Sequence, residues 1–279
     1  RPPLLPHAPA LDGLRGLAVA AVLLYHASLL DDLPGLERWI SGGFLGVSAF
    51  FTLSGFLITS LLVLEHERDG YISLGGFWGR RFRRLMPASL LLLAVVAILT
   101  PLVGTELQLA NLPGDIWSAL AYVFNWHSIL GGSDYAATFA TSQSPLKHVW
   151  SLSVEEQWYL VMPLLVGVAL WVGRGSRRWL GAVFAVLAIG STTLMWVLGG
   201  GEYANRIYLG TDTRLAEMAI GAILAVALAG RYAGEQRIRQ VFVTSLLDAV
   251  SVVLLVAGMA LWVTAHIGNS WLYRGGFAL

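Results

Sequence analysis

Seven apolar runs, each near the roughly 17 to 25 residues that a helix needs to cross a bilayer, constrain this chain more than any other feature. They cover approximately residues 12–30, 44–64, 86–103, 149–172, 179–198, 213–230 and 242–265. Only 13% of the residues are charged, against about a quarter in an average soluble domain. The sequence therefore predicts an all-α fold, a polytopic transmembrane helical bundle.

The two ends of the chain add further expectations. An eighth apolar run begins near residue 274, at "RGGFAL", and the chain stops within it, so we expect one domain over residues 1–279 that is truncated at its C-terminal end. The N-terminal "RPPLLPHAPALDG" lacks the pattern of a removable signal peptide, so the first helix would direct insertion. The chain has no cysteine, which excludes disulfides, thiolate metal sites and a cysteine nucleophile. We expect no metal and no permanently bound cofactor.

The run 115–130, "DIWSALAYVFNWHSIL", is about sixteen residues long and could span, lie at the interface, or dip in and return. Cytoplasmic segments of membrane proteins carry an excess of Lys and Arg. If the N-terminus is inside and 115–130 does not cross, twelve of the 18 Lys and Arg residues lie inside and four outside. We therefore predict a multi-pass protein of the cell membrane with a cytoplasmic N-terminus. Its long extracytoplasmic region, 104–148, would contain one non-spanning helix.

Two ionisable residues lie in the first apolar run. Arg15 and His26 are 11 residues apart, so they share a helix face and lie about 16 Å apart along the axis. Charges in a membrane are costly, on the order of 2.5–3.5 kcal/mol each, and often functional. Asp12, three residues before Arg15, can pair with it. Anchoring of Arg15 at the membrane surface and an interfacial His26 are the alternative.

Two adjacent acids, Glu155 and Glu156 in "SLSVEEQWYL", open the fourth run. Neighbouring helical residues point about 100° apart, so the two carboxylates cannot serve one partner. One would face a cavity and the other would hold a neighbouring helix. The alternative is a solvated helix N-terminus, where acids interact favourably with the dipole.

Four arginines lie in "GRRFRRLMP", residues 79–87, just before the third run. Arg80, Arg81 and Arg84 are spaced to converge on one helix face, and Arg83 is the member that we expect to face lipid. Arginine binds phosphates in a bidentate manner, so the three could form a phosphate clamp. Binding of lipid headgroups, combined with a role in setting topology, is the alternative.

Two further groups of residues have structural or binding roles to assign. In "TDTR", Asp212 and Arg214 lie at the mouth of the sixth run with Glu217 one turn deeper, as a structural ion pair or a substrate site.

In the second run, small residues permit close helix approach. We expect that run to pack against the first through Ser48, Phe50, Phe51, Ser54 and Gly55, with Gly46 also at the contact.

The chain resembles the acyltransferase-3 family of membrane O-acyltransferases. The resemblance lies in "LDGLRGLAVAAVLLYH", "GGFLGVSAFFTLSGFLITSLL", "FWGRRFRRLMPA", "NWHSIL", "WSLSVEEQWYLVMPLL" and "TDTRLAEMAIGAILA", in this order. It implies about ten membrane helices, of which the last three are absent from this chain. It also implies an acyl-CoA donor in the cytoplasm, with acetyl-CoA as the first expectation, and a carbohydrate or glycolipid acceptor outside.

The resemblance also implies residue roles. Arg15 and His26 would form the catalytic core, Arg80, Arg81 and Arg84 would lie at the donor side, and Glu155 and Glu156 match the family's paired glutamates. Acyl transfer to a hydroxyl needs a general base and stabilisation of the developing oxyanion. His26 suits the first role. Arg15 would orient the donor, and the pantetheine arm would thread between them.

Two other functions compete with this interpretation. A transporter or flippase for a glycolipid or an acylated intermediate would also carry Arg, Glu and His in its membrane helices, although we see no internal repeat of the kind that many transporters have. A non-catalytic scaffold would leave the buried ionisable residues unexplained. Membrane lipid is an expected partner and nucleic acid is not, while the sequence leaves the oligomeric state open.

Overall fold

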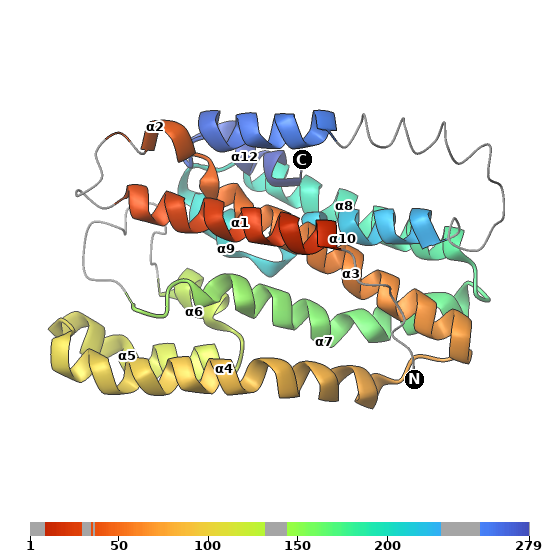
Figure 1. Ribbon diagram of the computed structural model, residues 1–279, viewed down its shortest axis with the longest axis horizontal. Coiled ribbons are helices and arrows are strands. Elements are labelled where there is room, and N and C mark those ends of the chain that lie inside the picture. Colours follow the sequence, from red (N-terminus) through yellow and green to blue (C-terminus); the bar gives the residue numbers. More distant parts are fainter. Residues whose placement is uncertain (1–8, 30–34, 36, 132–143, 230–251, 279) are drawn as a thin grey trace.

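The computed structural model describes residues 9–29, 35, 37–131, 144–229 and 252–278. Within these ranges the protein is built of helices and contains no strand, as the apolar runs predict. The long helices lie broadly along the long axis of the molecule (Figure 1).

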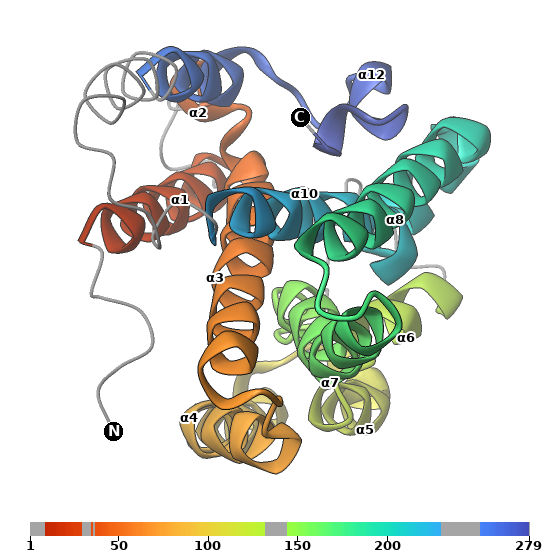
Figure 2. The ribbon, with the colours of Figure 1, turned by 90° about the vertical axis from the view of Figure 1, so that its right-hand side faces the viewer.

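The first half of the chain forms two layers of helices around α3. Its elements are α1 (Pro9–Ser28), α2 (Glu37–Ile40), η1 (Gly43–Leu45), α3 (Gly46–Asp69), α4 (Leu74–Val103), α5 (Glu106–Leu120), α6 (Phe124–Leu130) and α7 (Val149–Val172). Seen along the molecule, α3 has α1 and α10 at one end and α4 at the other, with α7 beside it (Figure 2).

The second half covers the other side of α3. Its elements are α8 (Arg177–Leu198), η3 (Gly201–Tyr203), α9 (Ala204–Leu209), α10 (Thr211–Ala229), a helix at Val252–Thr264, α12 (Ser270–Tyr273) and η4 (Gly276–Ala278). In the part of the chain that the structure describes, four helices are long and apolar enough to cross a membrane: Pro9–Ser28, Arg38–Asp69, Leu74–Val103 and Arg177–Leu198. The total of seven crossings stays a prediction.

Helix bounds follow the apolar runs closely in some places and depart from them in others. α7 coincides with the predicted run 149–172. α4 begins at Leu74, well before the predicted 86, and it continues through Pro87. The reason is that arginine is a good helix former, so the charged stretch joins the apolar one in a single helix. Of the predicted run 242–265, residues 242–251 lie outside the described residues.

The expected single helix at 115–130 is in fact two helices. Thr105 and Gln108 form a capping box that starts α5 well before residue 115. The helix then ends near Tyr122, whose φ of 54° lies in the left-handed region, and α6 follows. α5 turns back along α4 (Figure 1), and the turn Ala121–Val123 then joins α5 to α6 in a second helical hairpin, the α5–α6 hairpin.

The end of the chain also departs from the expectation of an eighth membrane helix. Residues 274–278 form a turn and the short 3-10 helix η4. Phe277 of η4 is buried against the ring of Tyr208 on α9. This segment therefore packs on the core.

Small residues on α3 allow close helix contacts, but the partners differ from those predicted. A Cβ at Gly46 would collide with the Ala18 carbonyl of α1, as expected, whereas one at Gly55 would collide with the Met218 carbonyl of α10. On α10, a Cβ at Gly221 would in turn collide with the backbone of α3. The prediction that Gly55 packs against the first helix is therefore wrong.

The other predicted contacts of α3 also point to different helices. The Ser48 hydroxyl contacts Arg214 of α10, Phe51 packs on Trp150 of α7, and Ser54 hydrogen-bonds Glu155 of α7. The reason is that α3 is central and is surrounded by neighbours, so its small and polar residues serve several helices.

Candidate functional site

Arg15 and His26 lie on the buried side of α1. Both are half-buried, on the face that carries the buried Ala18 and Tyr25. Arg15 lies 3.9 Å from the Asp12 carboxylate, which is the pair that the i, i+3 spacing predicts. The structure thus places the arginine and the histidine toward the rest of the bundle.

The ring of His26 has a defined orientation. Its Nδ1 lies 2.7 Å from the Val22 carbonyl oxygen, and since a carbonyl can only accept, Nδ1 must carry the hydrogen. In the neutral ring, Nε2 is then the basic nitrogen. This tautomer suits a general base.

A second histidine, which sequence reasoning missed, lies near the first. His148 directly precedes α7 and interacts electrostatically with His26 of α1. His148 is exposed, yet desolvation, and then the charge of His26, lower the pKa of His148 below its usual value. The two histidines are therefore close enough to interact electrostatically.

The polar residues of α7 follow one face of this helix. His148, Glu155 and Tyr159 are spaced i, i+7 and i+11, so they lie within one stripe. The Glu155 carboxylate accepts hydrogen bonds from the Ser54 hydroxyl and the Tyr159 phenol, and the phenol oxygen lies 3.0 Å from Ser54 Oγ. The heptad spacing of His148 and Glu155 was the signal that could have identified His148.

Glu156 points to a different side of α7, as the 100° step predicts. It lines a cleft of about 240 Å³ between α4, the α5–α6 turn and α7. Arg81 lines the same cleft, with its guanidinium 4.1 Å from the centre of the Tyr159 ring. Glu155 thus holds α3, and Glu156 faces a cavity.

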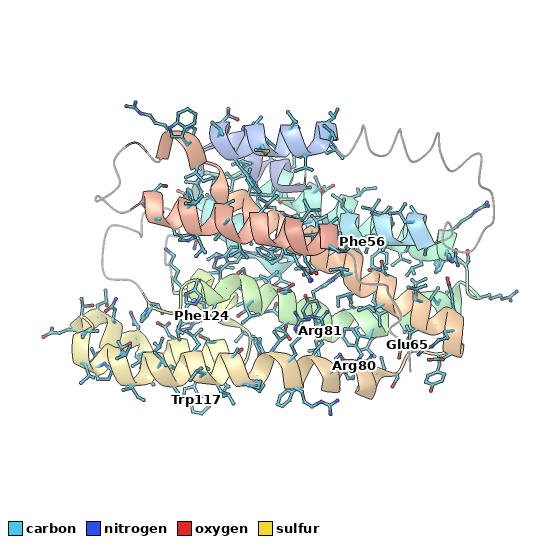
Figure 3. All side chains as sticks on the ribbon, in the orientation of Figure 1. Phe56, Glu65, Arg80, Arg81, Trp117 and Phe124 are labelled. Atoms are coloured by element: carbon cyan, nitrogen blue, oxygen red, sulfur yellow. The ribbon has the colours of Figure 1, made fainter. Side chains whose placement is uncertain are left out.

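The arginines of α4 differ in how far they are buried. Arg81 reaches from α4 toward α7 and is half-buried (Figure 3), whereas Arg80, Arg83 and Arg84 are exposed. Arg83 donates to the Gly79 carbonyl at 3.2 Å. The Arg81 guanidinium stacks on the Tyr159 ring of the neighbouring helix, and the convergence of Arg80, Arg81 and Arg84 on a phosphate stays a prediction.

Arg214 is enclosed at the centre of the bundle. It forms an ion pair of 3.1 Å with Glu217, and the side chains of the two residues are 0% and 2% exposed. Its guanidinium also lies 3.1 Å from Ser48 Oγ. Four aromatic rings surround it at 4.3 to 6.0 Å: Phe51, Trp150, Tyr208 and Phe277. A structural ion pair, one of the two predicted alternatives, is the role that this geometry favours.

Asp212 takes a partner that the sequence did not suggest. Arg206 of α9 donates two hydrogen bonds to it, of 2.8 and 2.6 Å, and the Arg206 guanidinium lies 4.8 Å from the Trp126 ring of α6. Asp212 therefore ties α10 to α9, and Arg214 pairs with Glu217 instead.

A buried amide network joins α6, α7 and α10 beside this pair. Asn125 donates to the Leu209 carbonyl and to Thr211. Gln157 donates to Asn125 Oδ1 and to the Tyr122 carbonyl at the hairpin turn. The network fixes the α5–α6 hairpin on α7, and it is the second feature that sequence reasoning missed.

No group of three or more His, Cys, Asp or Glu residues within the described ranges is placed to hold a metal ion. The chemistry that this arrangement supports is proton transfer by a histidine, with arginine as the cation at the other end of the polar stripe.

Comparisons with known proteins identify the family of this chain. A family model described as an acyltransferase domain, acyltransferase-3, matches residues 9–279. The O-acetyltransferase OatA of Staphylococcus aureus strain NCTC 8325 is 38% identical over 271 residues, which are 96% of this chain and 42% of OatA. The OatA of strain COL gives the same values. The chain thus spans less than half the length of these relatives. No solved structure matches it. The chain belongs to the acyltransferase-3 family.

Proposed function

We propose that this protein moves an acyl group, with acetyl as the first expectation, from a cytoplasmic acyl-CoA to a hydroxyl of an extracytoplasmic carbohydrate or glycolipid. Family membership and the O-acetyltransferase name of the relatives support an O-acyltransferase activity. The single observation that carries the proposal is the oriented ring of His26, which directs Nδ1–H to the Val22 carbonyl and leaves Nε2 as the base.

In this proposal His26 starts the reaction. Nε2 takes the proton of the acceptor hydroxyl while the hydroxyl oxygen attacks the thioester carbonyl. The carbon–sulfur bond then breaks, and the CoA thiolate leaves and receives the proton that Nε2 of His26 had taken. His148, which lies near His26, would hold the acceptor by a hydrogen bond.

The donor would bind at the other end of α7. Arg80 and Arg84 are exposed and would contact the phosphates of CoA, with Arg81 deeper. Arg15, on the buried face of α1, would add a cation at the cytoplasmic surface. The topology in this proposal has a cytoplasmic N-terminus in the cell membrane.

One structural feature favours transport as the second candidate. Broken helices that line a cavity at membrane depth occur in transporters, and the hairpin α5–α6 lines the cleft with its turn. A transporter would move its substrate without cleaving a thioester, so a chemical measurement separates the two.

The test is the release of free thiol from acetyl-CoA by the purified full-length protein with a glycan acceptor. We expect His26→Ala to lose at least 100-fold in rate, since general bases contribute about 10²–10⁴-fold. The matched control is His266→Ala, which removes an exposed ring. Equal rates in His26→Ala and the control would refute the base assignment, and no thiol release by the wild type would favour transport.

A further inference from the structure

The cleft between α4, the α5–α6 turn and α7 has the features of a binding site. Its volume of about 240 Å³ is below the roughly 300–1,000 Å³ of pockets that enclose a drug-sized molecule. The cleft therefore suits one segment of a longer ligand. Its walls include Trp78, Arg81, Ala121, Tyr122, Glu156 and Tyr159.

Most polar groups in these walls are already used by the protein. The Trp78 ring donates to the Tyr159 carbonyl at 3.2 Å, and the Tyr159 phenol donates to Glu155. Gln157, which also lines the cleft, is held by Tyr122 and Asn125. The walls therefore leave few groups for a ligand.

Two charged groups remain. Oε1 of Glu156 is buried and has no hydrogen-bond partner among the described residues, which is a costly arrangement unless a ligand supplies the donor. Arg81 stacks one face on Tyr159, and the described residues contain no ion pair of 4 Å or less between Arg81 and Glu156. A cation and an anion thus line one small cleft side by side, unpaired.

Arg81 and Glu156 together favour a ligand that is neutral and that carries both a hydrogen-bond donor and a hydrogen-bond acceptor. A phosphate would interact well with Arg81 but would be repelled by Glu156, whereas an amide offers an N–H to the carboxylate and a carbonyl to the guanidinium. The aromatic and aliphatic walls would accommodate a chain that connects such amides. An amide-bearing flexible arm fits this description.

We propose that the cleft holds the pantetheine arm of the acyl-CoA donor, with Glu156 accepting from an amide N–H and Arg81 donating to an amide carbonyl. This inference rests on the proposed function, and it moves the arm from the face of α1 to the space between α4 and α7. The position beside the exposed Arg80 and Arg84 supports it, because phosphates held there would lie next to the mouth of the cleft.

A lipid chain is the competing occupant. Phe82 and Leu160 both line the cleft and are both 61% exposed, so hydrocarbon could enter between them. Lipid would contact the apolar walls and leave Glu156 without a donor, which is why the amide-bearing arm is the better fit.

The experiment compares two ligands that differ by the arm. Dissociation constants of acetyl-CoA and of adenosine 3′,5′-bisphosphate, which lacks the 4′-phosphopantetheine arm, are measured by calorimetry for the purified full-length protein in detergent. Ala121→Phe fills the cleft from the hairpin turn, and Glu156→Leu removes the acceptor. The matched control is Ala88→Phe, the same enlargement on an exposed position of α4.

We expect Ala121→Phe and Glu156→Leu to weaken acetyl-CoA about tenfold and to leave the bisphosphate unchanged, while Ala88→Phe changes neither. If both cleft variants bind acetyl-CoA as the wild type does, the cleft is not the arm site and lipid is the better assignment, although the proposed function stands. If the wild type binds neither ligand, the donor assignment and the inference fall together. Thermal unfolding of each variant shows that the loss is not one of folding.

Discussion

Two arginine–glutamate neighbourhoods in this bundle differ in whether the two residues pair with each other. Arg214 and Glu217 form a 3.1 Å ion pair beside Ser48 and among four aromatic rings, although Arg214 Nε and Nη1 and both Glu217 carboxylate oxygens make no hydrogen bond within the described residues. Arg81 and Glu156 face one cleft, and the carboxylate oxygen Oε1 of Glu156 has no partner among the described residues. The same two residue types therefore serve the fold at the first place and are available to a ligand at the second.

The largest loss of stability should come from removing one partner of the Arg214–Glu217 ion pair. Removing one partner of a buried ion pair leaves an uncompensated charge and costs about 3–5 kcal/mol. We therefore expect Arg214→Leu to unfold the protein or to lower its melting temperature in detergent sharply. The double variant Arg214→Leu/Glu217→Leu should recover much of this loss. A single variant as stable as the wild type would show that the pair is not structural.

A slightly smaller effect should follow from separating the helices that enclose this pair. Ser48 is on α3 and Arg214 is on α10, and the two helices are in close contact at Gly55 and Gly221. Because a side chain at Gly55 would collide with the α10 backbone, Gly55→Leu should cost about 3 kcal/mol, the upper end of the roughly 1–3 kcal/mol of overpacking in a core. Gly79→Leu is the control, since a Cβ there meets open space. Equal melting temperatures would contradict the close contact.

A change at Arg81, beside the cleft, should lower the stability of the fold much less than a change at Arg214. Arg81 is half-buried and its visible contact is the stack on Tyr159, an interaction of about 0.5–2 kcal/mol. Arg81→Leu should therefore change the free energy of unfolding by no more than about 2 kcal/mol, against the larger loss for Arg214→Leu. Unfolding followed by tryptophan fluorescence would compare the two variants. Similar losses of unfolding free energy in Arg81→Leu and Arg214→Leu would show that the two arginines do not differ in their structural role.

The smallest effect concerns the histidine pair. A histidine whose pKa is lowered on folding favours the neutral form, so its contribution to stability is complete above the unfolded pKa of about 6.5 and is lost as pH falls below it. We expect the melting temperature of the wild type to fall more between pH 8 and pH 5 than that of His148→Gln. Parallel pH profiles of the two proteins would show that His148 is not desolvated beside His26.

The sequence allowed some of these features to be predicted and not others. α7 was predicted with correct bounds because its apolar run continues past the two acids near its start, and the divergence of Glu155 and Glu156 followed from the helical period alone. The pairing of Arg214 with Glu217 was open to the i, i+3 rule. These are properties of a single helix, and a single sequence contains them.

Contacts between two helices could not be predicted from the pattern of a single run. The spacing of Arg80, Arg81 and Arg84 predicted a shared helix face, but it gave no sign that Arg81 stacks on the ring of Tyr159 on another helix. The partner of Asp212 lies on α9, and Gly55 meets α10 because α3 is surrounded. Which helix is whose neighbour depends on the packing of the whole bundle, and the pattern of one run does not specify it.

The most direct test of ligand binding at Arg81 and Glu156 is the dissociation constant of acetyl-CoA for Arg81→Lys, measured by calorimetry in detergent without anionic lipid. Lysine keeps the charge but lacks the planar fork of donors that a guanidinium offers. We expect Arg81→Lys to bind acetyl-CoA about tenfold more weakly than the wild type does, with an unchanged melting temperature. An affinity equal to that of the wild type would contradict it, because Arg81 would then have no directed contact with the donor.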